Sequence, residues 1–141
     1  MRCLKLVSMV GLTLIGALAL LAACGQGSAG NVPGSSLAAR TVSVGGVEVT
    51  MKPVRIDSTG ASFEVTFDTH SSELALNVAR ASQLQVGGAA WGEASWSGDP
   101  PGGHHRRGEL RFRASGAARG DVRLSIVGLP GPVEAVWTLG S

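Results

Sequence analysis

Cysteine is scarce in this chain of 141 residues: there are two, Cys3 and Cys24, and both lie near the N-terminus. A domain formed by residues 25–141 therefore contains no thiol. It can have no disulfide, no thiolate-bound metal and no cysteine nucleophile. Such a domain must depend on its apolar core for stability, because the cross-links of many small exported domains are excluded.

An excess of positive charge is also missing. The chain has 12 Lys and Arg against 10 Asp and Glu, a formal net charge of +2. Two of the basic residues, Arg2 and Lys5, lie in an N-terminal segment that we expect to be cleaved, and without them the charges balance. Binding to the phosphates of nucleic acid requires a clustered positive surface. We therefore expect no nucleic-acid partner.

Catalytic motifs are absent as well. No Gly-x-Ser-x-Gly nucleophile elbow occurs in the sequence. The acidic residues are scattered singly, whereas a glycosidase needs two carboxylates that face each other across a cleft. No glycine-rich loop precedes a segment with a helical pattern, as a phosphate-binding loop requires. We expect that the protein is not an enzyme.

One long uncharged run is present, at residues 6–23. Arg2 and Lys5 precede it, and small residues end it at Leu21-Ala22-Ala23-Cys24. A positive start, an apolar middle and a small-residue end are typical of an export signal. A retained transmembrane helix is the alternative, because 18 residues is the lower limit for crossing a bilayer core of about 30 Å.

The residues Leu21-Ala22-Ala23-Cys24 resemble the lipobox of bacterial lipoproteins, in which an aliphatic and two small residues precede a cysteine. The resemblance covers residues 1–25. It implies cleavage before Cys24, a diacylglycerol on the Cys24 thiol, and two or three acyl chains, palmitate among them, that hold the protein at a membrane. The location would be the outer face of the cell membrane or, in a cell that has one, the outer membrane, since Gly25 rather than Asp follows the cysteine.

Three regions follow from these patterns. Residues 1–23 are the expected lipoprotein signal peptide. Residues 24–40 comprise the lipidated cysteine and a Gly- and Ser-rich stretch that predicts a flexible tether. Residues 41–141 are the expected folded domain.

Alternation of apolar and polar residues dominates the predicted domain and indicates half-buried strands. It is clear at residues 47–52, 63–68, 122–126 and 135–139. Turn residues separate the alternating segments. About seven short strands in one domain predict an all-β fold, a single antiparallel immunoglobulin-like β-sandwich, with a small barrel as the alternative.

Three details of this prediction concern the connections. Pro53 suggests an edge position or a bulge, and Gly87-Gly88 suggests a hairpin or a tight bend. The segment 71–84 is ambiguous between a strand that crosses to the second sheet and a helical turn around residues 77–82. We favour an irregular crossover there.

All three histidines fall in two short stretches, Asp68-Thr69-His70 and His104-His105-Arg106-Arg107. Side chains two residues apart on a strand point to the same face. Asp68, His70 and His105 therefore have the outward parity of their strands, whereas His104 has the inward parity. Zinc or copper bound by Asp68, His70 and His105, joined by His104 if the glycine loop breaks the alternation, is one hypothesis.

Two other interpretations of these stretches stay open. His70 can cap a strand end while His104 and His105 form hydrogen bonds that fix the loop of residues 99–103. Arg106 and Arg107 can instead contact an anion or a protein partner.

The segments Phe67–Ser71 and Pro100–Gly108 are similar to those of a group of bacterial Ig-like domains. The resemblance extends over the domain from Thr41 onward. It implies the fold, but no function is attached to that group, so it implies no site.

The sequence as a whole predicts a membrane-anchored extracytoplasmic lipoprotein whose β-sandwich binds an envelope protein or a wall component, or has a structural role. Apart from the lipid on Cys24 we expect no cofactor. An exposed aromatic patch around Trp91 and Trp96 would suit a binding domain, although both tryptophans can equally belong to the core. The alternative function is extracytoplasmic binding of zinc or copper through Asp68, His70 and His104 or His105.

Overall fold

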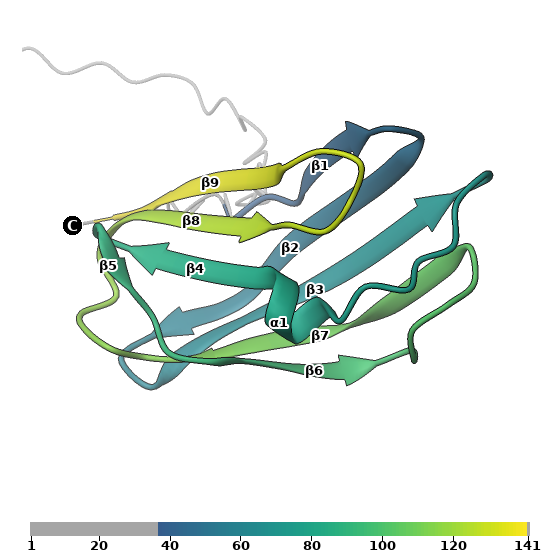
Figure 1. The fold of residues 1–141 in the computed structure, drawn as a ribbon. Coiled ribbons are helices and arrows are strands. Elements are labelled where there is room, and N and C mark those ends of the chain that lie inside the picture. Colours follow the sequence, from purple (N-terminus) through teal and green to yellow (C-terminus); the bar gives the residue numbers. More distant parts are fainter. Residues whose placement is uncertain (1–36, 141) are drawn as a thin grey trace, which may run out of the picture. The chain divides into compact units, whose positions relative to one another are not determined.

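Residues 37–140 are the part of the chain that the structure, a computed structural model, describes. They form two antiparallel sheets that pack as a sandwich, so the all-β prediction is confirmed (Figure 1). The five-stranded sheet has the order β1-β2-β3-β7-β6, and the four-stranded sheet has the order β5-β4-β8-β9.

The strands of the five-stranded sheet are β1 (Arg40–Val44), β2 (Val47–Asp57), β3 (Gly60–Thr69), β7 (His105–Arg113) and β6 (Ala94–Gly98). Those of the four-stranded sheet are β5 (Ala89–Ala90), β4 (Ser82–Val86), β8 (Gly120–Ile126) and β9 (Val133–Leu139). One helical turn, α1 (Val78–Ala81), precedes β4.

Seven of these strands have the connectivity of an immunoglobulin constant-type sandwich. The neighbours β2-β3-β7-β6 correspond to the order A-B-E-D, and β4-β8-β9 correspond to C-F-G. β1 and β5 are additions at the sheet edges. The first arises because the Gly45-Gly46 turn, with φ of 55° and 80°, divides the first alternating stretch into two paired strands.

The core lies between the sheets and consists of the inward residues of the alternating pattern. Phe63 packs against Trp137 of the opposite sheet, with ring centroids 5.6 Å apart, and against Phe112. Other fully buried large side chains come from both sheets, namely Phe67, Met51, Leu84, Leu110, Leu124, Ile126, Val47 and Val49.

Pro53 coincides with a shift of the β2–β3 register between Pro53 and Arg55, so the predicted irregularity is a bulge. The β1–β2 pairing ends at Met51, so at Pro53 the side of β2 away from β3 is also a local sheet edge. A bulge suits proline because this residue has no amide hydrogen to donate to a neighbouring strand.

The segment between β3 and β4 combines two of the predicted possibilities: residues 70–77 form an irregular crossover to the other sheet, and a helical turn follows it. Residues 78–81 form α1, and the Asn77 side chain caps it by accepting a hydrogen bond from the Arg80 amide at 3.1 Å. Val78 is buried, so the turn is fixed by packing as well as by its cap. The predicted Gly87-Gly88 hairpin is confirmed between β4 and β5.

β1 lies against β9, so one long side of the sandwich is closed (Figure 1). The Trp137 indole donates a hydrogen bond to the Ala38 carbonyl at 2.7 Å, and Leu37 packs against the core. Residues 37–40, which we had assigned to the tether, therefore belong to the sandwich. The rest of that segment, and the signal, lie outside the described residues.

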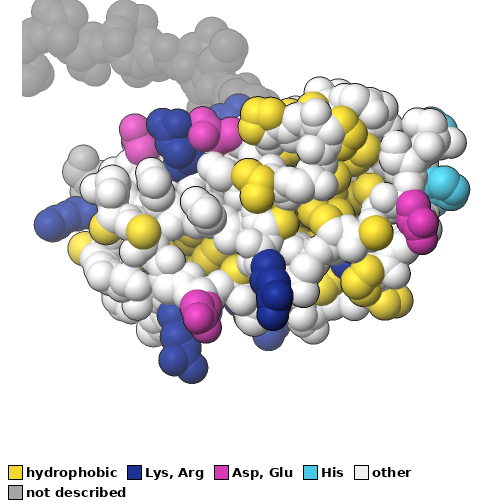
Figure 2. All heavy atoms as spheres, in the orientation of Figure 1, with side chains coloured by type: hydrophobic (Ala, Val, Ile, Leu, Met, Phe, Trp, Pro, Cys, Tyr) yellow, Lys and Arg dark blue, Asp and Glu magenta, His cyan; other side chains and the backbone are white. Residues whose placement is uncertain are grey.

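The two tryptophans of the expected patch have different environments. Trp91 is 6% exposed and belongs to the core, whereas Trp96 is partly exposed and packs edge-on against Phe67. The prediction of an exposed aromatic patch formed by both tryptophans is therefore wrong. Figure 2 views the molecule from the side of the four-stranded sheet and shows hydrophobic atoms between scattered charged side chains.

Candidate functional site

The two stretches that contain the histidines meet at one end of the sandwich. The Thr69 amide donates to the His104 carbonyl at 2.9 Å, which extends the β3–β7 pairing by one step. The Leu74 amide donates to the Gly103 carbonyl at 3.0 Å, and the Gly102 amide donates to the Leu74 carbonyl at 2.9 Å. The connection after β3 and the loop between β6 and β7 therefore form one hydrogen-bonded unit, which we call the loop junction (residues 69–76 and 99–106).

Arg106 is the centre of the loop junction and is 2% exposed. Its Nη1 donates to the carbonyls of Leu74 and Leu76 at 2.9 and 2.8 Å, and its Nη2 donates to the Asp99 carbonyl at 3.2 Å. The guanidinium also lies 5.8 Å from the centroid of the Trp96 ring, within range of a cation–π contact. Arg106 thus ties both loops to the sheet.

Burial lowers the pKa of Arg106, and the Asp99 carboxylate partly offsets this effect. Because the ordinary pKa of arginine lies far above neutrality, Arg106 keeps its charge at neutral pH despite this lowering of its pKa. Because the charged group is enclosed and occupied by carbonyls, contact with an outside anion or partner through Arg106 does not fit the structure. Arg107 alone of the two is exposed.

The histidines take separate partners. His105 Nδ1 lies 2.5 Å from Asp68 Oδ1, and the two residues are directly opposite each other on β7 and β3. His104 Nδ1 lies 3.0 Å from the Ser72 carbonyl, within the loop junction. His70 is exposed just after the end of β3. The His104 bond lies within the loop junction and the His105 bond joins β7 to β3, so the interpretation that histidine hydrogen bonds fix the loop of residues 99–103 stays a prediction.

Asp68 and His70 line a shallow hollow of about 290 Å³ together with Glu48. Within residues 37–140, however, no group of three or more His, Cys, Asp or Glu side chains is arranged to hold a metal ion. His105 points to Asp68 and His104 to Ser72. The structure thus brings together Asp68 with His70 and Asp68 with His105, but no three of the expected ligands. Within the described residues it offers the zinc or copper hypothesis no support.

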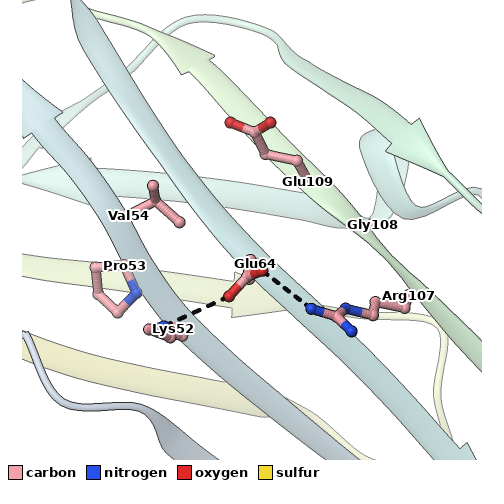
Figure 3. Close-up of a pocket in the computed structure, with 7 residues that line it drawn as sticks. All are labelled: Lys52, Pro53, Val54, Glu64, Arg107, Gly108 and Glu109. Carbon is pink, nitrogen blue, oxygen red and sulfur yellow. Dashed lines mark hydrogen bonds and ion pairs between the residues drawn. The ribbon is translucent and has the colours of Figure 1, made fainter.

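A larger hollow of about 590 Å³ lies on the outer face of the five-stranded sheet, at the β2 bulge (Figure 3). Glu64 is at its centre, where it accepts a hydrogen bond from Arg107 at 3.2 Å and pairs with Lys52 at 3.6 Å. The lining comes from three neighbouring strands and comprises Lys52, Pro53, Val54, Glu64, Arg107, Gly108 and Glu109.

Glu109 lies opposite Glu64 in the β3–β7 register, which raises the question of a carboxylate pair for acid–base catalysis. The Arg111 side chain donates a hydrogen bond to Glu109 at 2.6 Å, and this bond is the main reason why the pKa of Glu109 is lowered. A general acid needs a raised pKa to hold its proton near neutrality. The shift of Glu109 therefore has the wrong sign for that role.

Sequence reasoning missed this charged face because it depends on strand register. Alternation already gave Glu64 an outward direction, and the same rule applies to Lys52 and Arg107 on their own strands. Which of these side chains are neighbours depends on the pairing of β2, β3 and β7, which periodicity does not contain.

Comparison with protein-family models, with curated proteins and with solved structures finds no match to this chain. The similarity to bacterial Ig-like domains therefore stays a prediction. Cys24 and the lipobox lie outside the described residues. Among residues 37–140 there is no helix with the length and apolar character needed to cross a membrane.

Proposed function

We propose that this protein is a lipid-anchored extracytoplasmic lipoprotein whose β-sandwich binds an envelope protein or a wall component without catalysis. The observation that carries the proposal is the lipobox Leu21-Ala22-Ala23-Cys24 a short distance before the sandwich, which begins by Leu37. A thioether-linked diacylglycerol with a further acyl chain gives the two hydrophobic anchors that stable membrane attachment requires.

The geometry of the domain supports binding over catalysis. The loops at one end are held by Arg106, and the outer face of the five-stranded sheet presents ion pairs such as Arg107–Glu64 around an open hollow. A rigid sheet with fixed side chains presents a surface to a partner at little cost in conformational entropy. The lowered pKa of Glu109 supports the same view, because it favours a permanent charge over proton transfer.

Replacement of one cysteine tests the anchor. Cys24→Ser should abolish incorporation of a clickable palmitate analogue and leave unprocessed precursor or released protein, as judged by labelling, mass spectrometry and membrane fractionation. Cys3→Ser is the matched control, because Cys3 lies in the expected signal peptide and its loss should change none of these readouts. A Cys24→Ser chain that kept the label, the wild-type mass and the membrane fraction would show that the proposal is wrong.

A further inference from the structure

β6 is an edge strand that pairs with β7 on one side. The Asp99 amide donates to the Arg107 carbonyl at 3.0 Å, so these two residues form a hydrogen-bonded pair. Such pairs alternate along an antiparallel ladder. The main-chain groups of Ser95 and Ser97 therefore point to β7, and those of Ala94, Trp96 and Gly98 point outward.

The spacing of two glycines supports this assignment. Gly98 is opposite Gly108, and a Cβ built on Gly98 would lie 2.4 Å from the Gly108 Cα. Such a close approach is typical of a pair that exchanges no hydrogen bonds. The backbone N–H and C=O of Gly98 are thus directed away from β7.

The outward groups of β6 have no backbone partner within residues 37–140. The other edges are treated differently. β1 and β9 lie against each other, and the turn before β9 packs tightly on β1, since a Cβ on Gly131 would lie 2.5 Å from a Val44 methyl group. β5 has two residues. α1 lies beside β6 but forms no backbone hydrogen bond with it, so within residues 37–140 β6 offers a row of donors and acceptors without a backbone partner.

Side chains do not protect this edge. Charged residues, proline and bulges are the usual means by which an edge strand avoids pairing with another chain. The sequence of β6 is Ala-Ser-Trp-Ser-Gly, with neither charge nor proline, and its register with β7 is regular. At its centre, Trp96 is partly exposed.

We propose that two copies of this chain pair through β6, antiparallel and with Trp96 opposite Trp96, so that their five-stranded sheets become one sheet of ten strands. Ala94 of each copy then lies opposite Gly98 of the other. This register joins the outward groups of all three residues in both copies. The contact uses the same surface twice, so it closes at two copies.

Charge complementarity argues for a second copy as the occupant. One cross-strand row on the outer face consists of Lys52, Glu64, Glu109 and Ser97, and the next outward row consists of Arg55, Ser62, Arg111 and Ser95. In the proposed register Ser97 of one copy lies opposite Ser95 of the other. The charged residue nearest the seam is Glu109 in the first row and Arg111 in the second, so the Glu109 row of each copy continues as the Arg111 row of its partner.

The serines leave room for this attraction. They are small, and they leave the Glu109–Arg111 ion pair of each copy, 2.6 Å long, facing the same ion pair of the other copy with opposite charges in line. A five-residue pairing is nevertheless smaller than the interfaces of stable dimers, which bury about 1,200–2,000 Å². We expect weak association in solution, and confinement by the proposed lipid anchor would raise its extent, since it raises the effective concentration.

Disulfide trapping in the full-length chain tests the pairing and its register. Ser95→Cys and Ser97→Cys chains with tags of different size are produced together in membranes and oxidised mildly. Residues 95 and 97 of opposite copies form a pair without hydrogen bonds, with Cα atoms about 4.5 Å apart, which suits a disulfide. Identical positions are offset by two residues along the strand, beyond disulfide reach. We expect the mixed pair to cross-link at least several-fold more than either variant alone.

The parent chain, with Cys3 and Cys24, measures the background. Glu134→Cys with Thr138→Cys is the matched pair on the covered β9 edge, and its cross-linking should not exceed that of the parent chain. Ala94→Pro removes an outward amide without touching the β7 ladder and should reduce the trapping. Equal cross-linking in all combinations, or none in the mixed pair, would overturn the proposal. The same trapping at matched concentration in a Cys24→Ser background separates edge pairing from anchoring, because it should persist where the lipid label is lost.

Discussion

Strand β7 separates two environments, and the neighbouring residues Arg106 and Arg107 lie on opposite sides of it. Arg106 is 2% exposed and donates to three main-chain carbonyls, whereas Arg107 is exposed and pairs with Glu64. The two have the same chemistry and adjacent positions. The period of two along a strand makes one a structural centre and the other a surface charge.

The comparison shows where a polar contact contributes to stability in this domain. When a buried donor loses its acceptors, or a buried acceptor loses its donor, the free energy of unfolding falls by the full desolvation cost of the groups left unpaired. An exposed ion pair is screened by water and contributes about 0–1 kcal/mol. We therefore expect the inner side of the five-stranded sheet to determine the stability of the fold and the outer side to affect it little.

The largest effect should come from the inner side at Phe67, which is fully buried opposite Arg106 in the β3–β7 register. Phe67→Ala should lower the free energy of unfolding by about 3–5 kcal/mol, because it leaves a cavity in the core. Leu124→Ala, in the opposite sheet, should cost roughly 2–5 kcal/mol. Urea unfolding measures both. Glu64→Ala on the outer side is the control and should cost under about 0.5 kcal/mol; similar values at all three positions would contradict the assignment of faces.

The arginines provide the sharpest test. Arg106→Met keeps the length of the side chain but leaves the Leu76 carbonyl without its partner and removes the contact with Trp96. It should cost about 2–4 kcal/mol and increase amide exchange in the loop junction. Arg107→Met, the matched control, should cost under about 1 kcal/mol and leave exchange unchanged. Equal costs would show that Arg106 does not hold the loops.

The smallest expected effect is the change of stability with pH that arises from carboxylates on the outer side. Hydrogen bonds from Arg111 to Glu109 and from Thr59 to Asp57 lower the pKa of each carboxyl below its ordinary value. Lowered pKa values stabilise the folded state above the unfolded pKa of about 4, and this contribution is lost as the pH falls through the folded values. The melting temperature should fall slightly between pH 5 and pH 3, and less so in Glu109→Gln. A rise in that range would contradict the assigned directions.

The patterns that predicted the fold are local. Alternation at Phe63, Val65 and Phe67 fixes a strand and its buried face regardless of the rest of the chain. The segment 71–84 lacked such a pattern. Its helical turn depends on Val78, which reaches a core that the sequence alone does not show, and on the Asn77 cap. The same limit explains residues 37–40, where Trp137 contacts Ala38 from the far end of the chain.

The candidate site was predictable in composition but not in arrangement. Alternation correctly placed His105 and Asp68 on the outer face, and both stretches with histidine do lie together. Arg106 was misjudged, although its parity matches that of Leu110 and Phe112 on the inner side. Charge suggested an exposed residue, and the carbonyls that accept its hydrogen bonds come from residues 74, 76 and 99, which only the folded chain brings near.

The sequence by itself determined the all-β class, the inward and outward faces of the strands and the lack of thiols beyond Cys24, because composition and a period of two need no partner. The tertiary structure decided which charges are neighbours, what Arg106 holds and which edge stays open. These features depend on strand order and register, and each joins residues from separate segments, such as Glu64 of β3 and Arg107 of β7. Their free energies arise from contacts that no single segment of the chain contains.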